Sequence, residues 1–223
     1  AYTAVDKAED DQENAYLVNA KAVEYLAKIE KEKNSQFIHI SSDYVFDGTE
    51  LIPRTESDQT NPIGVYGETK LKGENLALEN NPNTIIIRTA WVYSRFGNNF
   101  VKTMLRLFKE KESISVVGDQ IGSPTNALDL AKAILDITLV DKVAHGIFNY
   151  SNEGECSWFQ FAQKIKELSG ATTEIHSVPT SAYPTKAKRP AYSLLDKSKI
   201  KEVFQVEVPN WEDSLKEELK YLV

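Results

Sequence analysis

The sequence predicts an α/β fold with a parallel sheet, and three observations carry this prediction. Helical segments and short strand-like segments alternate along most of the chain. The strand-like segments at residues 38–40 and 85–87 read as apolar runs, which is typical of strands covered by helices on both faces. With 223 residues, of which 41% are hydrophobic and 26% charged, the chain can bury a sizeable core without disulfides or metals.

The first half of the chain is expected to form three helices, each with apolar residues at helical spacing. In order, these helices cover residues 8–33, 66–78 and 98–111. The short apolar stretches that follow each of them are expected to be strands, at residues 36–41, 84–88 and 114–117. A proline-containing surface loop over residues 47–64 precedes the second helix, and Pro82 follows its end.

The second half alternates in the same way, but its strands are weaker and its loops longer, so we expect a separate, smaller lobe. Its helices are expected at residues 127–139, 157–168 and 211–222, and its strands at 146–150 and 174–178. Gly170 caps the middle helix, because glycine readily adopts the left-handed conformation that ends many helices. Residues 183–192 are expected to form a basic loop that holds Lys186, Lys188 and Arg189.

Composition and charge argue against several classes of protein. Acidic side chains outnumber basic ones by 33 to 26, and the net charge of −7 disfavours binding to the phosphates of nucleic acids. No apolar run approaches the roughly 20 residues of a membrane helix, and no signal peptide opens the chain. One cysteine, Cys156, and three widely separated histidines leave no pattern of metal ligands. We therefore expect a cytoplasmic protein that binds neither nucleic acid, membrane nor metal.

The common phosphate-binding motifs do not occur in this sequence. Neither G-x-G-x-x-G nor G-x-x-x-x-G-K-[ST] is present, and the nearest cluster, Gly64, Gly67 and Gly73, has the wrong spacing. The residues alone therefore do not demonstrate a complete dinucleotide site.

Tyr66 and Lys70 lie four residues apart in an expected helix, so their side chains share one face. A tyrosine has an ordinary pKa of about 10, and a nearby ammonium group lowers that pKa because it favours the phenolate. Such a pair can pass a proton to or from a carbonyl or hydroxyl oxygen. The same spacing also arises by chance in a chain with this many tyrosines and lysines, so its surroundings decide its meaning.

Polar and aromatic residues follow the two apolar strands of the first half. Ser42 and Asp43 come directly after the first of these strands, and Trp91 comes shortly after the second. In parallel α/β sheets, ligands bind at the carboxyl ends of the strands. We therefore expect Ser42, Trp91 and the Tyr66–Lys70 pair to face one crevice.

The sequence resembles the extended short-chain dehydrogenase/reductase family, and most of all its dTDP-4-dehydrorhamnose reductase branch. The resembling stretches are residues 1–9, 40–48, 66–74, 87–93, 117–125 and 189–196, in family order. The Ser-Asp-Tyr-Val-Phe-Asp-Gly and Gly-Asp-Gln-Ile-Gly-Ser-Pro-Thr stretches are specific to this branch, whereas the Tyr-x-x-x-Lys pair belongs to the whole superfamily. The resemblance implies a Rossmann-like, doubly wound parallel sheet. It assigns residues 1–112 to the dinucleotide-binding domain and 113–223 mainly to a substrate-binding lobe, with some elements returning to the first domain.

The resemblance also implies a reaction, in which NADPH or NADH delivers hydride to C4 of a dTDP-linked 4-keto-6-deoxy sugar. Tyr66 would donate the proton to the developing alkoxide, and Lys70 would hold the nicotinamide ribose and lower the tyrosine pKa. Ser42 would bond the keto oxygen, in a position where the family often has threonine. The product would be dTDP-L-rhamnose, which is used in cell-surface polysaccharide.

Further residues match family positions that contact the two ligands. Asp43 and Trp91 match positions that line the sugar pocket, and Arg189 lies in a loop that could reach the nucleotide diphosphate. The cofactor side comprises Tyr66 and Lys70 together with Tyr2, Thr3 and Ile40. Members of the family can bind a magnesium ion at a dimer contact; a homodimer stays open here, and no metal is expected.

This sequence departs from the family at its N-terminal end, because the family's first strands and Gly-rich turn would precede Ala1. We therefore expect the strand over residues 36–41 to lie at the edge of the sheet, and the chain alone to be inactive. Two alternatives remain open. One is a non-catalytic, nucleotide-binding regulatory relative; the other is a different nucleotide-sugar reductase or epimerase of the same fold. Retention of Ser42, Tyr66 and Lys70 favours an enzyme.

Overall fold

The computed structural model describes residues 1–140 and 144–223. Its strands are β1 Ile38–Ser42, β2 Ile85–Thr89, β3 Val92–Tyr93, β4 Ser113–Val117, β5 Ile121–Gly122, β6 Thr125–Asn126, β7 Gly146–Asn149, β8 Cys156–Ser157 and β9 Glu174–Val178. Its α-helices are α1 Val5–Ala8, α2 Gln12–Tyr16, α3 Ala22–Glu32, α4 Val65–Asn80, α5 Phe100–Glu110, α6 Ala127–Leu139, α7 Trp158–Ser169, α8 Ser198–Phe204 and α9 Trp211–Leu219. A π-helical turn, η1 Leu17–Lys21, joins α2 to α3, and short 3-10 turns are η2 Asp43–Val45 and η3 Thr180–Ala182.

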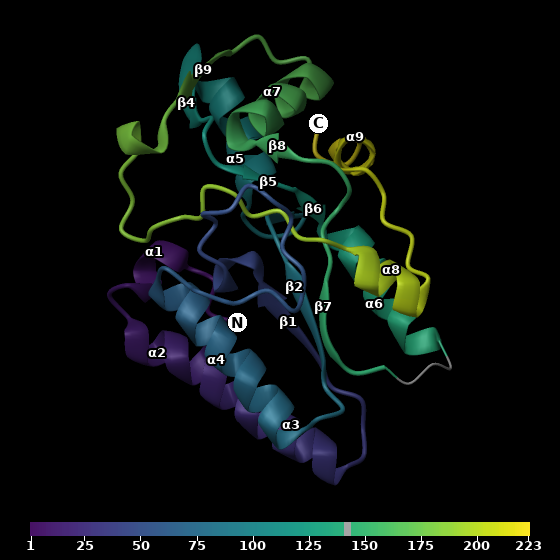
Figure 1. Cartoon of the computed structure of the whole chain (residues 1–223). Helices are drawn as coiled ribbons and strands as arrows, with labels where there is room; N and C mark the ends of the chain where they lie inside the picture. Colours follow the sequence, from purple (N-terminus) through teal and green to yellow (C-terminus); the bar gives the residue numbers. More distant parts are fainter. Residues whose placement is uncertain (141–143) are drawn as a thin grey trace.

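Strands β1, β2 and β7 form a parallel sheet in that order, with helices on both faces (Figure 1). Alternate side chains of β2 point to opposite layers, as strand geometry requires. Ile86 packs against α3 and α4, whereas Ile85 and Ile87 pack against α6 and α8. All three are fully buried, which explains the apolar run. The expected α/β fold with a doubly wound parallel sheet is confirmed, and within the described residues β1 lies at the sheet's edge.

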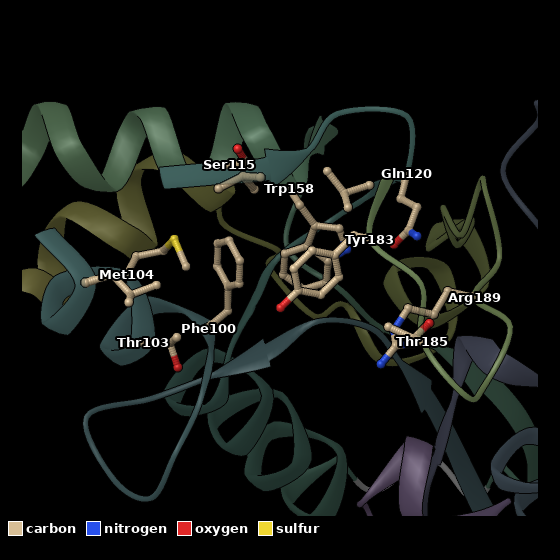
Figure 2. Close-up of a pocket in the computed structure, with 12 residues that line it drawn as sticks. Phe100, Thr103, Met104, Ser115, Gln120, Trp158, Tyr183, Thr185 and Arg189 are labelled. Atoms are coloured by element: carbon tan, nitrogen blue, oxygen red, sulfur yellow. The ribbon is translucent and has the colours of Figure 1, made fainter. Parts of the chain in front are cut away.

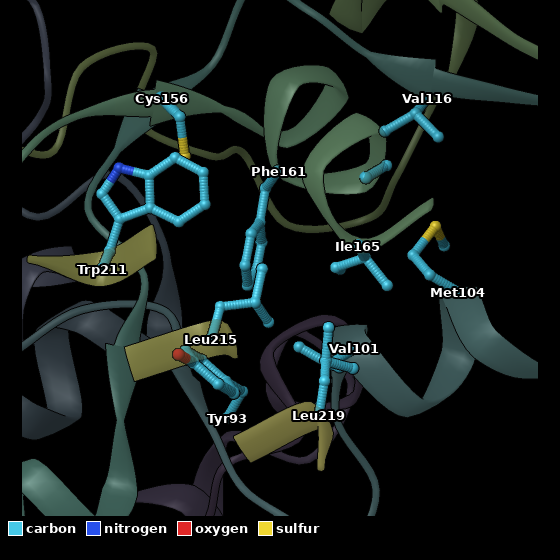
Figure 3. Packing of buried hydrophobic residues seen from close by; sticks show 11 residues of the cluster. Tyr93, Val101, Met104, Val116, Cys156, Phe161, Ile165, Trp211, Leu215 and Leu219 are labelled. Atoms are coloured by element: carbon cyan, nitrogen blue, oxygen red, sulfur yellow. The ribbon is translucent and has the colours of Figure 1, made fainter. Parts of the chain in front are cut away.

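Most of the second half of the chain, together with α5, builds a lobe above the carboxyl ends of this sheet (Figure 1). Parallel strands β4 and β9 pair there, and α5, α7 and α9 enclose an apolar cluster with the Phe161 ring at its centre (Figure 3). The Phe161 ring meets Trp211 edge-on, with centroids 5.6 Å apart. Strand β7 and helices α6 and α8, also from the second half, return to the main sheet. The division at residue 112 stays a prediction.

The prediction of a single helix over residues 8–33 is wrong in its first part. Helix α1 ends at Ala8 and α2 begins only at Gln12, because the turn between them directs the Glu9 carboxylate to the N-terminus of α4, where it accepts the Val65 N–H at 3.0 Å. Farther along, the π-helical turn η1 interrupts the α-helical geometry. The sequence analysis also missed α8 and the two-residue strands.

The remaining expected elements are found close to their predicted bounds. Helix α6 matches residues 127–139, and Gly170 ends α7 in the left-handed conformation with φ 68°. None of the helices in the described ranges is both long and apolar enough to cross a membrane. Within the same ranges, no group of three or more histidine, cysteine or acidic side chains is placed to hold a metal ion.

Candidate active site

The carboxyl end of β1 carries two of the predicted residues. The Ser42 hydroxyl donates a hydrogen bond of 2.9 Å to Asp43 Oδ1 and accepts the Tyr44 N–H at 3.2 Å. Both Ser42 and Asp43 are buried, and Asp43 Oδ2 has no hydrogen-bond partner among the described residues. Burial raises the pKa of the Asp43 carboxyl to about 6, although the hydroxyls of Ser42 and Ser193 act in the opposite direction. A hydroxyl and a carboxyl that titrates near neutral pH therefore lie side by side.

Tyr66 lies in the first turn of α4, close to the end of β1. Its ring meets the Tyr44 ring edge-on, with centroids 5.4 Å apart. Gly67 permits this approach, since a Cβ there would lie 2.2 Å from the Tyr44 carbonyl oxygen. Burial raises the pKa of Tyr66 to about 12; the Asp43 carboxylate raises it as well, and the Ser42 hydroxyl lowers it. The phenol is therefore protonated at neutral pH, with Ser42 beside it.

Lys70 lies one turn along α4 and is buried. Its Nζ donates a hydrogen bond of 2.6 Å to the Ile40 carbonyl oxygen and lies 3.5 Å from His39 Nε2. Burial lowers the pKa of Lys70 to about 8, and Glu74 acts in the opposite direction. The expected lowering of the Tyr66 pKa by Lys70 is not found, because strand β1 holds the ammonium group. Burial and the Lys70 charge lower the pKa of His39 to about 3, so its ring is neutral.

The N-terminal segment with Tyr2 and Thr3 is tied to α4 through Asn19. The Tyr2 N–H donates to Asn19 Oδ1 at 2.7 Å, and Asn19 Nδ2 donates to the Tyr2 carbonyl oxygen at 3.0 Å and to Thr69 Oγ1 at 3.2 Å. The Tyr2 hydroxyl donates to Asp11 Oδ2 at 2.9 Å, and Thr3 is exposed. Asn19 is buried in the π-helical turn, and such turns are frequent at functional sites.

Trp91 follows β2 in a left-handed backbone conformation, with φ 47°. Its indole stacks on that of Trp158, with centroids 3.5 Å apart and planes inclined by 10°. Gly122 leaves room for this ring, because a Cβ at that position would lie 2.6 Å from it. A non-glycine residue with positive φ is uncommon, and such strain often accompanies a functional position.

Trp158 also lines a pocket of about 330 Å³ between α5, β4 and the loop that precedes Arg189 (Figure 2). The lining is mainly apolar, and Phe100, Met104 and Tyr183 contribute to it. Polar side chains at its margin are Thr103, Ser115, Gln120, Thr185 and Arg189. An apolar pocket with a few polar groups is the usual form of a small-molecule site.

Arg189 reaches this pocket but is already paired. Its Nη2 lies 2.7 Å from Asp6 Oδ2, and Nη1 donates to Asp6 Oδ1 at 3.2 Å and to the Ala187 carbonyl oxygen at 3.1 Å. This bond to the guanidinium lowers the pKa of the Asp6 carboxyl. The ion pair joins the basic loop to α1.

The structure thus gathers Ser42, Asp43 and Tyr66 at one sheet edge, with Lys70 and Ile40 beneath them. Trp91 follows β2 at this edge and stacks on Trp158, and Trp158 lines the pocket. The sequence analysis missed Asn19 and Trp158. The signal for Asn19 was a polar residue on an otherwise apolar face of a predicted helix. The signal for Trp158 was a tryptophan at the start of a predicted helix.

A Rossmann-like sheet that presents a serine, a tyrosine and a lysine at its carboxyl edge defines a protein of the short-chain dehydrogenase/reductase type. The whole chain, residues 1–223, matches the family model described as RmlD substrate binding domain. The chain belongs to this family, that of the dTDP-4-dehydrorhamnose reductases.

Curated relatives with that name are similar over nearly the whole chain. The chain is 44% identical to dTDP-4-dehydrorhamnose reductase of Sinorhizobium fredii, over 96% of this chain and 75% of the relative. It is 43% identical to the reductase of Salmonella typhimurium, over 97% of this chain and 75% of the relative.

Solved structures of such reductases have the same fold. The protein from Clostridium acetobutylicum superposes with a TM-score of 0.95 at 41% identity, covering 100% of this chain and 78% of the other. The reductase from Bacillus anthracis, solved in complex with NADP, gives a TM-score of 0.94 at 38% identity, covering 99% and 78%.

Proposed function

We propose that this protein reduces dTDP-4-dehydro-L-rhamnose to dTDP-L-rhamnose, with NADPH or NADH as the reductant. The observation that carries the proposal is the arrangement of Ser42, Tyr66 and Lys70 at the carboxyl edge of the sheet. A scaffold protein has no need of a buried hydroxyl, phenol and ammonium group at one place, because each costs free energy to bury. The names of the relatives supply the substrate and the NADP cofactor.

The residues present fit the nicotinamide half of the cofactor. Lys70 carries three donor hydrogens; one bonds to the Ile40 carbonyl oxygen at 2.6 Å, and a second faces His39 Nε2 at 3.5 Å. The remaining donor suits a ribose hydroxyl, and the exposed segment with Thr3 runs close to α4, which bears Lys70. When bound, the reduced nicotinamide supplies the hydride. Lys70, Ile40, Tyr2 and Thr3 would hold it.

The proton for the new alcohol comes from Tyr66 in this proposal. Because the Tyr66 pKa of about 12 keeps the phenol protonated, its hydroxyl is in the correct form to act as a general acid. The Ser42 hydroxyl accepts the Tyr44 N–H and donates its single hydrogen to Asp43, so this hydrogen must turn from Asp43 to the keto oxygen when Ser42 shares that oxygen with Tyr66. Developing negative charge on that oxygen favours proton transfer from the phenol.

The pocket beside Trp158 is the proposed place of the dTDP group. Its apolar walls suit a pyrimidine base, and Trp91, which stacks on Trp158 of the pocket lining, would meet the sugar. Arg189 would meet the diphosphate, since a planar guanidinium matches phosphate oxygens. The Arg189–Asp6 pair orients that guanidinium at the margin of the pocket.

The test is an assay of NADPH oxidation by the complete gene product with dTDP-4-dehydro-L-rhamnose, with the product identified as dTDP-L-rhamnose. The proposal predicts turnover that requires both substrates. NADPH binding without turnover would favour a non-catalytic relative instead. Turnover with a different 4-keto nucleotide sugar, but not with this one, would indicate another reductase of the same fold.

Two further features of the proposal concern the assembly and the compartment. The helix that contains α2, η1 and α3 exposes apolar side chains, namely Leu17, Val18, Tyr25, Leu26 and Ile29. Charged residues beside them pair internally, so the face suits the same apolar face of a second copy, and we include a homodimer. Light scattering on the wild type and on Leu26→Glu tests the dimer, because the wild type should have the mass of a dimer and the variant that of a monomer. Equal molar masses for the two proteins would contradict the dimer.

The compartment is proposed from the cysteine. A single buried, free cysteine fits the reducing cytoplasm.

A further inference from the structure

One ion pair of this structure is almost completely buried, directly behind the candidate site. Arg88 of β2 is 2% exposed and Glu74 of α4 is 0% exposed. The Arg88 Nε donates to Glu74 Oε1 at 3.0 Å, and Arg88 Nη2 donates to Glu74 Oε2 at 2.7 Å. The guanidinium also lies 5.1 Å from the centre of the Phe46 ring. A buried pair of this kind costs desolvation energy and is weak evidence of added stability, so its presence calls for another explanation.

Glu74 has a second cation within reach. Lys70 lies four residues earlier on α4, and residues at this spacing share one face of a helix. The Lys70 ammonium nevertheless bonds to the Ile40 carbonyl oxygen, and among the described residues it forms no ion pair with Glu74. The two carboxylate oxygens of Glu74 are instead both occupied by Arg88.

We propose that Arg88 is a positioning residue that holds the Glu74 carboxylate away from Lys70, so that the Lys70 ammonium stays on strand β1 and keeps a donor hydrogen for the cofactor. This inference rests on the proposed function, since it assumes that Lys70 binds the nicotinamide ribose. The planar guanidinium matches both carboxylate oxygens at once, whereas an ammonium group does not. Arg88 therefore wins the competition for Glu74 in the intact protein.

Without Arg88, the Glu74 carboxylate should pair with Lys70 instead. A carboxylate left buried without a partner seeks the nearest cation, because an isolated buried charge is costly. For Glu74 that cation is Lys70, whose pKa already responds to this carboxylate. An ion pair between them would turn the ammonium away from strand β1 and would occupy the donor that the ribose needs.

The test compares Arg88→Met with the double variant Glu74→Gln/Arg88→Met. The purified complete gene product is titrated with NADPH by fluorescence, which needs no turnover, and KM for NADPH and kcat are then measured. Arg88→Met should weaken NADPH binding by about ten- to a hundredfold, the value of one or two hydrogen bonds to a charged group. The double variant should bind NADPH within about threefold of the wild type. Arg106→Met, which breaks the exposed Arg106–Glu110 pair, is the control.

A purely structural role for Arg88 gives a different pattern. The double variant would then bind NADPH as weakly as Arg88→Met, and this result would overturn the proposal. If Arg88→Met does not fold, the folded double variant still decides, because weak binding there contradicts the proposal and normal binding supports it. Wild-type enzyme that binds NADPH but shows no turnover would refute the proposed function and leave this inference standing.

Discussion

The indole rings of Trp91 and Trp158 stack with their centroids 3.5 Å apart, although the two residues come from different halves of the chain. Trp91 follows strand β2, next to the candidate catalytic residues, and Trp158 begins α7 and lines the pocket of the second lobe. The stack therefore connects the proposed place of the sugar with that of the nucleotide.

Replacing Trp158 by leucine should raise KM for the nucleotide sugar by about two- to tenfold, the value of an aromatic pair beyond its buried area. KM for NADPH should not change, because Trp158 lies away from Lys70 and Ile40. Steady-state kinetics with each substrate varied in turn measure both constants. Phe96→Leu changes an exposed aromatic ring and is the matched control. An increase in KM for NADPH alone would place Trp158 on the cofactor side.

Tyr66→Phe should lower kcat by about 10²–10⁴-fold, the usual contribution of a positioned general acid. The ring still packs against Tyr44, so the protein should fold and bind NADPH as before. Tyr25→Phe, at an exposed tyrosine, is the control. Rapid-mixing kinetics with one enzyme equivalent of NADPH measure the chemical step directly. Near-normal turnover in Tyr66→Phe would remove this residue from the mechanism.

Asp43→Asn should stabilise the protein more at pH 7 than at pH 4. Burial raises the Asp43 pKa from 3.8 to about 6 in the folded state, so the charged form is disfavoured there. The stability that the protonated group contributes is present below the unfolded pKa and is lost as pH rises through about 6. Between pH 4 and pH 7, the free energy of unfolding of the variant should rise relative to that of the wild type by on the order of 2–3 kcal/mol.

Urea unfolding of both proteins at a series of pH values measures this difference. Glu32→Gln, which changes an exposed carboxylate in the same way, is measured beside them as the control for loss of a negative charge. A gap between Asp43→Asn and the wild type that stays constant from pH 4 to pH 7 would contradict the assigned burial of this charge.

Gly73→Ala should disturb the contact between α4 and the π-helical turn. A Cβ at residue 73 would lie 2.1 Å from the backbone carbonyl oxygen of Asn19, which cannot move without its helix. We expect a loss of about 1–3 kcal/mol, as for other overpacked positions, with weaker NADPH binding as Asn19 shifts. In Gly64→Ala the new Cβ would meet only the flexible Glu9 carboxylate, so its effect should be smaller. Equal melting temperatures for the two variants would contradict this packing.

The long periodic elements could be predicted from the sequence because one local signal defines each of them. Residues 127–139 carry a regular apolar face and form α6 as expected. The π-helical turn was not predicted; the backbone of Asn19 in this turn packs closely on Gly73, and the two residues are far apart in the sequence. Helix α8 is short, and its apolar residues Ile200 and Phe204 are buried in a cluster with residues of the sheet and of α6 that are distant in the sequence.

The candidate site was predictable to the same extent. Ser42 could be placed because it follows a predicted strand, and Tyr66 because it begins a predicted helix. Parallel strands present their carboxyl ends at one edge of the sheet, where ligands bind. The partner of Arg189 was not predictable, since Asp6 lies at the other end of the chain. The direction of Lys70 was missed for the same reason, because the Ile40 carbonyl that holds it belongs to a different element.

The most direct test of the central claim follows the hydride itself. NADPH that carries deuterium at the transferable position of nicotinamide C4 is incubated with the enzyme and dTDP-4-dehydro-L-rhamnose, and the product is examined by mass spectrometry and NMR. The proposed function predicts dTDP-L-rhamnose with deuterium at sugar C4, formed by the wild type and almost undetectably by Tyr66→Phe. Product without deuterium at C4, or equal deuterium transfer by both proteins, would contradict it.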